Sequence, residues 1–151
     1  MNRFKTILAM LAFVLLAISC QKDETPKMEY LDVTPNNLAG DWKLVEWKGA
    51  PLLEQTYFYM TLVRRDQTFT FYQNFGSIGQ NAQVLTGRYD IEYDPASGAV
   101  FVGEYDYSSG FFAHSFYVRE LTSDSMTWVA VDDSAYVQKF VRTSIPAGLK
   151  K

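Results

Sequence analysis

The residue with the greatest capacity for acid–base chemistry is His114, the only histidine among the 151 residues. A histidine activates a nucleophile only when a serine or cysteine lies within hydrogen-bond distance of it. Ser115 follows His114 directly, but consecutive residues of a strand point to opposite faces, so these two side chains cannot form a dyad. Cys20 is the only cysteine and lies far away in the sequence. We therefore expect His114 to be a wall residue, and we expect no catalytic residue and no enzymatic activity.

Metal and phosphate chemistry are also disfavoured by the residue types. One histidine and one cysteine do not supply the clustered ligands that zinc sites use. The acidic pairs Asp132-Asp133 and Asp23-Glu24 are interpreted as turn and tether residues. The spacing Gly76-x-x-Gly79 lies in a predicted loop with no helix after it, so it is no phosphate cradle. The sequence predicts no metal site and no cofactor.

The leader is the clearest local signal. Arg3 and Lys5 precede twelve consecutive apolar residues at 7–18, which is typical of a secretory signal. A membrane-spanning helix needs about 20 apolar residues, so this run is too short to be one. The segment Leu16-Ala17-Ile18-Ser19-Cys20 resembles the lipobox of bacterial lipoproteins, although Ala17 stands where that family usually has Leu. The resemblance implies that residues 1–19 are a lipoprotein signal peptide and that Cys20 is lipidated, so that acyl chains anchor the protein to a membrane.

Residues 20–37 are interpreted as the lipidated cysteine and a tether, because they are rich in charged residues, threonine and proline. By resemblance to lipoprotein sorting rules, Gln21 after the cysteine favours the outer membrane. Lys22-Asp23-Glu24 resembles the surface-export tag of some Gram-negative lipoproteins. An ordinary solvated linker is the alternative, so the periplasmic face and the cell surface both stay open.

Charge argues against nucleic acid as a partner. Without Arg3 and Lys5 of the leader, 12 basic and 17 acidic residues remain, a net charge of about −5. No short segment gathers lysine or arginine, so no surface is suited to follow a phosphate backbone.

The residues after the leader are predicted to form β-strands. An aromatic share of 16% and alternating apolar residues between Gly, Pro, Asp and Ser indicate an all-β fold. Eight antiparallel strands joined in sequence close into an up-and-down barrel, which removes exposed edges. One barrel domain is expected over residues 38–147. The predicted strands are 40–47, 57–64, 67–73, 84–93, 98–106, 111–121, 125–132 and 135–143.

Gly40-x-Trp42 together with Arg142 resembles the lipocalin family, over residues 38–143. That resemblance implies a ligand-binding barrel and a short helical turn at 34–37 that closes its base. Trp42 starts the first strand and Arg142 ends the last, so both lie at the base and can stack, a contact worth ~0.5 to 2 kcal/mol. An ordinary core tryptophan and a solvated arginine are the alternative.

The expected interior follows from period-two alternation with Trp42 facing inward. Most inward positions are apolar or aromatic, and the polar ones lie toward the mouth, which suits a small-molecule pocket. The predicted ligand-binding residues are Glu46, Phe58, Phe71, Gln73, Tyr105, Phe112, His114, Tyr136 and Gln138.

Two functions remain open. The first is a lipid-anchored cell-envelope protein that binds a small apolar or amphipathic ligand. The second is a protein-interaction module at the outer membrane, in which a filled barrel supports loops that contact an envelope or host protein. A cavity above ~300 Å³ favours the first and a filled barrel the second. Apolar residues at 50–53 and 75–78 are expected on the mouth loops, either as a lid over the pocket or as a plug packed on itself.

Overall fold

The computed structural model describes residues 27–75, 81–107 and 110–150. The predicted signal peptide, Cys20 and the proposed export tag lie outside the described residues, so they stay predictions. Within the described part, no helix has both the length and the apolar character needed to cross a membrane.

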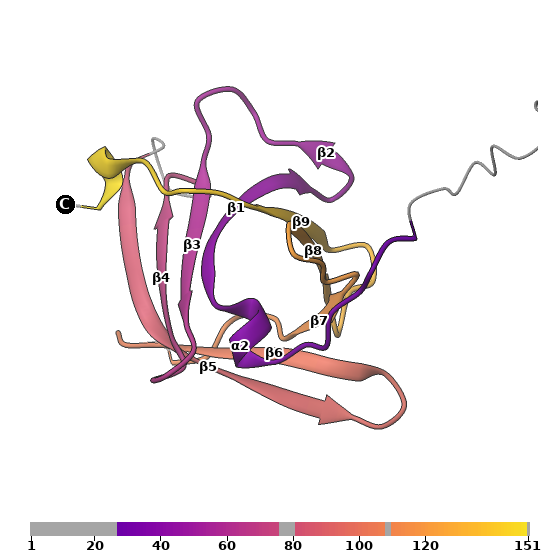
Figure 1. Ribbon diagram of the computed structural model, residues 1–151. Coiled ribbons are helices and arrows are strands. Elements are labelled where there is room, and N and C mark those ends of the chain that lie inside the picture. The colour runs from indigo at the N-terminus through magenta and orange to yellow at the C-terminus, as the bar shows by residue number, and fades with distance from the viewer. Residues whose placement is uncertain (1–26, 76–80, 108–109, 151) are drawn as a thin grey trace, which may run out of the picture.

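The described chain forms one antiparallel sheet that closes on itself (Figure 1). Neighbouring strands follow the order of the chain, and β9 pairs back with β1, so eight strands make a barrel. The predicted all-β, eight-stranded up-and-down fold is confirmed. The strands are β1 (Gly40–Trp47), β2 (Ala50–Pro51), β3 (Phe58–Val63), β4 (Thr68–Gln73), β5 (Gln83–Asp94), β6 (Gly98–Tyr105), β7 (Phe116–Arg119), β8 (Ser125–Ala130) and β9 (Val137–Arg142).

Strand β2 is a two-residue strand outside the eight-stranded ring. The sequence predicts a loop at these residues. Lys48 and Gly49 form the turn between β1 and β2, with φ of 51° and 80°. Positive φ at both central residues is the hallmark of the type I′ turn, whose twist matches that of a hairpin. The end of β1 therefore folds back on itself at the rim of the barrel.

Strand β7 is shorter than the predicted run 111–121. Phe111 makes only a single bridge to Glu104, and regular pairing with β6 is limited to two residue pairs. Between these points the chain leaves β6: the Ser115 carbonyl accepts a hydrogen bond from Val131 N, beyond the end of β8, at 2.9 Å. The segment before β7 thus crosses the rim.

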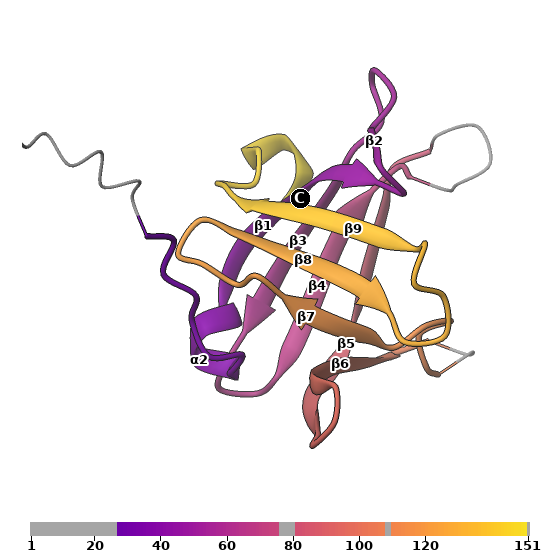
Figure 2. The ribbon, with the colours of Figure 1, turned by 90° about the vertical axis from the view of Figure 1, so that its right-hand side faces the viewer.

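A helical turn, α2 (Pro35–Leu38), closes one end of the barrel. Thr34 caps it by accepting a hydrogen bond from Asn37 N at 3.2 Å, and proline fits the first helical turn because its missing N–H would have no partner there. Figure 2 shows α2 at the opposite end from β2. We call the α2 end the base and the β2 end the mouth.

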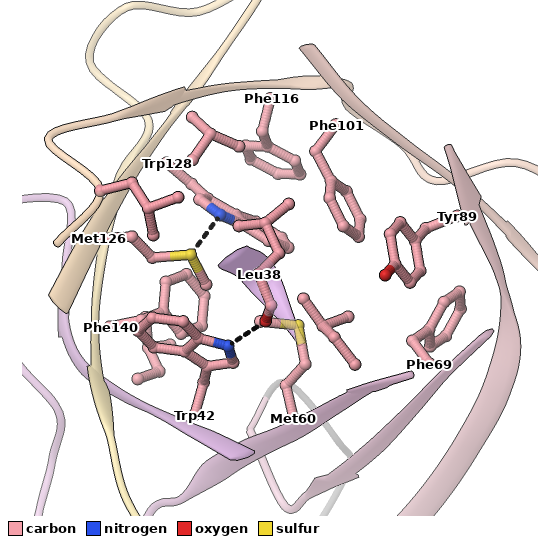
Figure 3. Packing of buried hydrophobic residues seen from close by; sticks show 14 of the residues in the cluster. Leu38, Trp42, Met60, Phe69, Tyr89, Phe101, Phe116, Met126, Trp128 and Phe140 are labelled. Atoms are coloured by element: carbon pink, nitrogen blue, oxygen red, sulfur yellow. Dashed lines mark hydrogen bonds between the residues drawn. The ribbon is translucent and has the colours of Figure 1, made fainter. Parts of the chain in front are cut away.

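The interior near the base is filled by large side chains (Figure 3). Two indole N–H groups find partners inside it: Trp42 Nε1 donates to the Leu38 carbonyl at 2.8 Å, and Trp128 Nε1 donates to Met126 Sδ at 3.3 Å. Packed side chains therefore occupy this part of the interior. The fully buried residues of the whole core include Leu38, Trp42, Leu44, Met60, Phe69, Phe101, Met126, Trp128 and Phe140.

Arg142 stacks on Trp42 as the sequence reasoning expected, with its Cζ atom 4.1 Å from the ring centroid. Its guanidinium also donates to three backbone carbonyls: Ala39 and Asn37 at 2.6 Å each, and Ser123 at 2.9 Å. Arg142 therefore joins the α2 plug, the start of β1 and the turn before β8. The alternative of a solvated arginine is wrong.

The glycine of Gly40-x-Trp42 has a physical reason. Its φ is +123°, a conformation that L side chains rarely adopt, and a Cβ atom would lie 2.5 Å from Arg142 Nη1. The motif and the late arginine therefore depend on the same packing.

The end of the predicted tether belongs to the folded domain. Leu31 N donates to the carbonyl of the buried Leu121 at 2.7 Å, and Leu31 and Val33 pack against the core. Met28 and Tyr30 stay exposed. The chain thus becomes fixed at the base of the barrel before α2 begins.

Candidate functional site

A hollow of about 170 Å³ opens at the mouth of the barrel. Its walls are mainly aromatic rings, with a few polar side chains among them. The structure places eight of the nine residues predicted for ligand binding in its lining. The lining residues are Phe58, Phe71, Gln73, Phe75, Tyr105, Phe112, Ala113, His114, Phe116, Trp128, Tyr136 and Gln138.

Glu46 is the exception, and its predicted inward position is wrong. A β-bulge between Leu44 and Glu46 shifts the register, so Glu46 lies opposite Lys139 and Trp47 lies opposite Gln138. A bulge adds one residue to one strand and inverts the alternation after it. Glu46 therefore points outward and forms an ion pair with Lys139 at 2.9 Å. Trp47 takes the inward place that alternation had given to Glu46.

Four lining residues were absent from the predicted ligand-binding set. The same inward alternation includes Phe116 and Trp128, but neither is among the predicted ligand-binding residues. Phe75 lies on a mouth loop whose apolar character was noted. Only Ala113 gave no signal, because strand alternation fails where the chain leaves β6.

The wall formed by β4, β6 and the segment before β7 is a set of touching rings. Phe112 lies 5.6 Å from Phe71 and 4.8 Å from Tyr105, measured between ring centroids. Phe112 fits there because Gly103 has no side chain: a Cβ atom would clash with the ring. Burial, with smaller contributions from Tyr107 and Tyr136, raises the pKa of Tyr105 to about 12, so its hydroxyl stays protonated.

His114 is held by an acidic residue from another loop. Its Nδ1 lies 2.7 Å from Asp132 Oδ1, on the connection between β8 and β9. Its ring lies 4.9 Å from the ring of Tyr136. The hydrogen bond from His114 is the main reason why the pKa of Asp132 falls below its usual value. Sequence reasoning treated Asp132 as a turn residue, and nothing local to it indicates this contact across 18 residues.

A cation and an unpaired donor also lie near Tyr136. Lys48 Nζ lies 4.6 Å from the Tyr136 ring centroid and 5.1 Å from that of Trp47. Trp47 packs edge-on against Phe75 and Tyr136. Its Nε1 is buried and, in the part of the chain that the structure describes, has no hydrogen-bond partner.

This arrangement is suited to binding. The lining of the hollow contains aromatic rings, two glutamines and His114, but no serine, threonine, cysteine or carboxylate to act as a nucleophile. Over the described ranges, no three His, Cys, Asp or Glu residues gather where a metal ion would fit.

Comparisons of the chain with protein-family models, with curated proteins and with solved structures find no match. The class of the protein therefore follows from its own architecture. It is an all-β protein built on a closed, eight-stranded antiparallel barrel in which each strand pairs with its neighbours in the chain.

Proposed function

We propose that this protein is a lipid-anchored, lipocalin-like binding protein of the cell envelope that holds a small apolar or amphipathic ligand in the mouth of its barrel. The observation that carries the proposal is the hollow at the mouth, with aromatic walls and a few polar side chains. Binding sites for small molecules have this composition. The function is binding rather than catalysis, and it involves no nucleic acid.

The size of the hollow limits the ligand. At about 170 Å³ it is below the ~300 Å³ that favours ligand binding by size, so the composition of the lining, and not its volume, supports the proposal. A cavity of about 150 Å³ with apolar walls accommodates benzene. The ligand, or the part of it that enters the barrel, is therefore one ring or the end of a short chain, and a haem or a sterol is too large.

The docked tether supports an orientation relative to the membrane. Leu31 is fixed at the base through Leu121, and six residues lie between Cys20 and Lys27, so the chain from Cys20 to Lys27 reaches ~25 Å at most. If acyl chains on Cys20 hold the protein at the outer membrane, the base faces the lipid. The mouth then opens toward the aqueous side, either in the periplasm or at the cell surface, where a soluble ligand can enter.

The test is a pair of substitutions at adjacent positions of β9. Gln138 lines the hollow, whereas Lys139 pairs with Glu46 on the outer face. Gln138→Phe should fill the space and abolish binding of ring compounds such as toluene and p-cresol, followed by ligand-observed NMR. Lys139→Phe adds the same ring outside the barrel and should leave binding unchanged. If the wild type binds none of these compounds, the proposal fails.

A second function, a protein-interaction module, is favoured by apolar residues exposed on the mouth loops. Leu53 and Phe111 are 77% and 76% exposed, and Tyr107 is 46% exposed. Exposed aromatic side chains are common anchors in protein interfaces. A photo-crosslinking residue at Phe111 should then capture one envelope or host protein in living cells, whereas the same residue at Arg65, on the turn at the base, should not. Equal labelling at both positions contradicts an interface at the mouth.

A further inference from the structure

We propose that the ligand carries a hydroxyl group on its apolar ring, as phenols do, and that His114 Nε2 accepts the hydrogen bond from that hydroxyl. This inference rests on the proposed binding function and names the class of ligand for the same hollow. It follows from the contact between His114 and Asp132 and from the place of His114 in the lining.

The contact with Asp132 decides which ring nitrogen carries the proton. An ionised carboxylate only accepts hydrogen bonds, so at 2.7 Å from Asp132 Oδ1 the Nδ1 atom of His114 is the donor. A neutral imidazole has one N–H, and the hydrogen bond at one nitrogen sets the state of the other. Nε2 of the neutral ring is therefore an acceptor, and no hydrogen bond to it is found among the described residues.

The direction of the free nitrogen follows from the contacts of the ring. Asp132 lies on the outer rim, where its side chain is 62% exposed, and the two nitrogens of an imidazole point in widely different directions. The His114 ring packs against Tyr136 and Phe116, at 4.9 Å and 6.2 Å between ring centroids, and these contacts constrain its orientation. With Nδ1 directed to the rim and the ring lining the cavity, Nε2 is presented to the ligand.

A hydroxyl fits the other polar groups of the hollow better than an anion does. The Asp132 carboxylate beside His114 repels a negative charge at that wall. The Gln138 amide on β9 lines the same space and can donate to a hydroxyl oxygen. Lys48, whose Nζ lies 4.6 Å from the Tyr136 ring centroid, favours electron-rich atoms at the rim. A carboxylate seated against Lys48 is the competing ligand chemistry, and the experiment includes it.

The experiment compares three small compounds on the folded domain: p-cresol, its near-isostere 4-fluorotoluene, which has no donor, and benzoate. Titrations followed by NMR at mildly alkaline pH should show p-cresol binding roughly threefold to tenfold tighter than 4-fluorotoluene, the range expected for one net hydrogen bond. Benzoate should bind more weakly than p-cresol.

Two variants and a control locate the effect. His114→Phe should remove the preference for p-cresol while 4-fluorotoluene still binds. Asp132→Ala, an exposed change, should reduce the preference and shift the ¹⁵N signals of the His114 ring toward the Nε2–H tautomer, which a merely structural role would not do. Lys139→Met changes a side chain on the outer face of the same barrel, where Lys139 pairs with Glu46, and should keep the preference.

The outcomes separate the two proposals. Equal affinity for p-cresol and 4-fluorotoluene, or a preference that survives in His114→Phe, overturns the hydroxyl inference and leaves ring binding intact. Tighter binding of benzoate also overturns it, in favour of an anion at Lys48. Failure of all three compounds to bind overturns the proposed function itself.

Discussion

Replacing Arg142 by methionine tests how the barrel is closed. Methionine keeps an unbranched apolar chain over Trp42 but removes the guanidinium and its three hydrogen bonds. Two of them, to Ala39 and Asn37, are partly buried, and bonds to a charged group are worth about 1.5 kcal/mol or more each. The stacking on Trp42 at 4.1 Å adds about 0.5 to 2 kcal/mol. The exposed bond to Ser123 counts for little, so the free energy of unfolding should fall by about 3 to 5 kcal/mol.

The measurement is urea denaturation followed by tryptophan fluorescence, with Arg119→Met as the matched control. Arg119 also lies over an aromatic ring, that of Tyr117 at 4.6 Å, but it makes no carbonyl hydrogen bonds in the described structure. Its replacement should cost less than about 1 kcal/mol. If Arg142→Met costs no more than Arg119→Met, the carbonyl bonds contribute nothing and the reasoning is refuted. A double-mutant cycle of Arg142 with Trp42 should show coupling.

Three further predictions follow from buried polar groups and from the leader. Trp47→Phe removes an unpaired N–H and should change the free energy of unfolding by less than about 1 kcal/mol. Trp128→Phe, in the packed core, should lower the free energy of unfolding by about 2 kcal/mol or more. Urea denaturation measures both changes. Burial raises the pKa of Tyr89 and Tyr105 from 10.0 to about 12. Because these tyrosines ionise at lower pH in the unfolded chain than in the folded protein, their contribution to the free energy of unfolding should be fully present below pH 10 and decline above it. The tyrosinate absorbance of the folded protein should accordingly appear at higher pH than that of the unfolded chain. Cys20→Ala should leave an uncleaved precursor or release the protein from the membrane fraction; a cleaved variant that stays membrane-bound contradicts lipidation.

The barrel was predictable because its signals are local or periodic. Alternating side chains identify strands one by one, and strands joined by short turns pair with their neighbours. Gly40-x-Trp42 and Arg142 marked the two strands that meet at the closure, since both lie at the base when the strand number is even. Eight of the nine predicted wall residues followed from the same alternation.

The sequence by itself did not determine the details of the mouth. Whether Glu46 or Trp47 faces inward depends on a bulge, which is fixed by the register of β1 against β9 and by no residue pattern within β1. The contact between His114 and Asp132 arises because the loop after β8 lies at the rim beside the segment that precedes β7. Such placements depend on long-range geometry.

The size of the hollow also belongs to the tertiary structure. Alternation states which side chains face the interior, but the free volume depends on how closely their rings pack. Gly103 lets the Phe112 ring lie against β6, and Gly87 lets the Phe69 ring lie against β5. These rings therefore fill interior space that an eight-stranded barrel could otherwise leave open. The strand number and most of the inward residues follow from the sequence pattern, whereas a cavity of about 170 Å³ is what remains after side chains from all the strands have packed together.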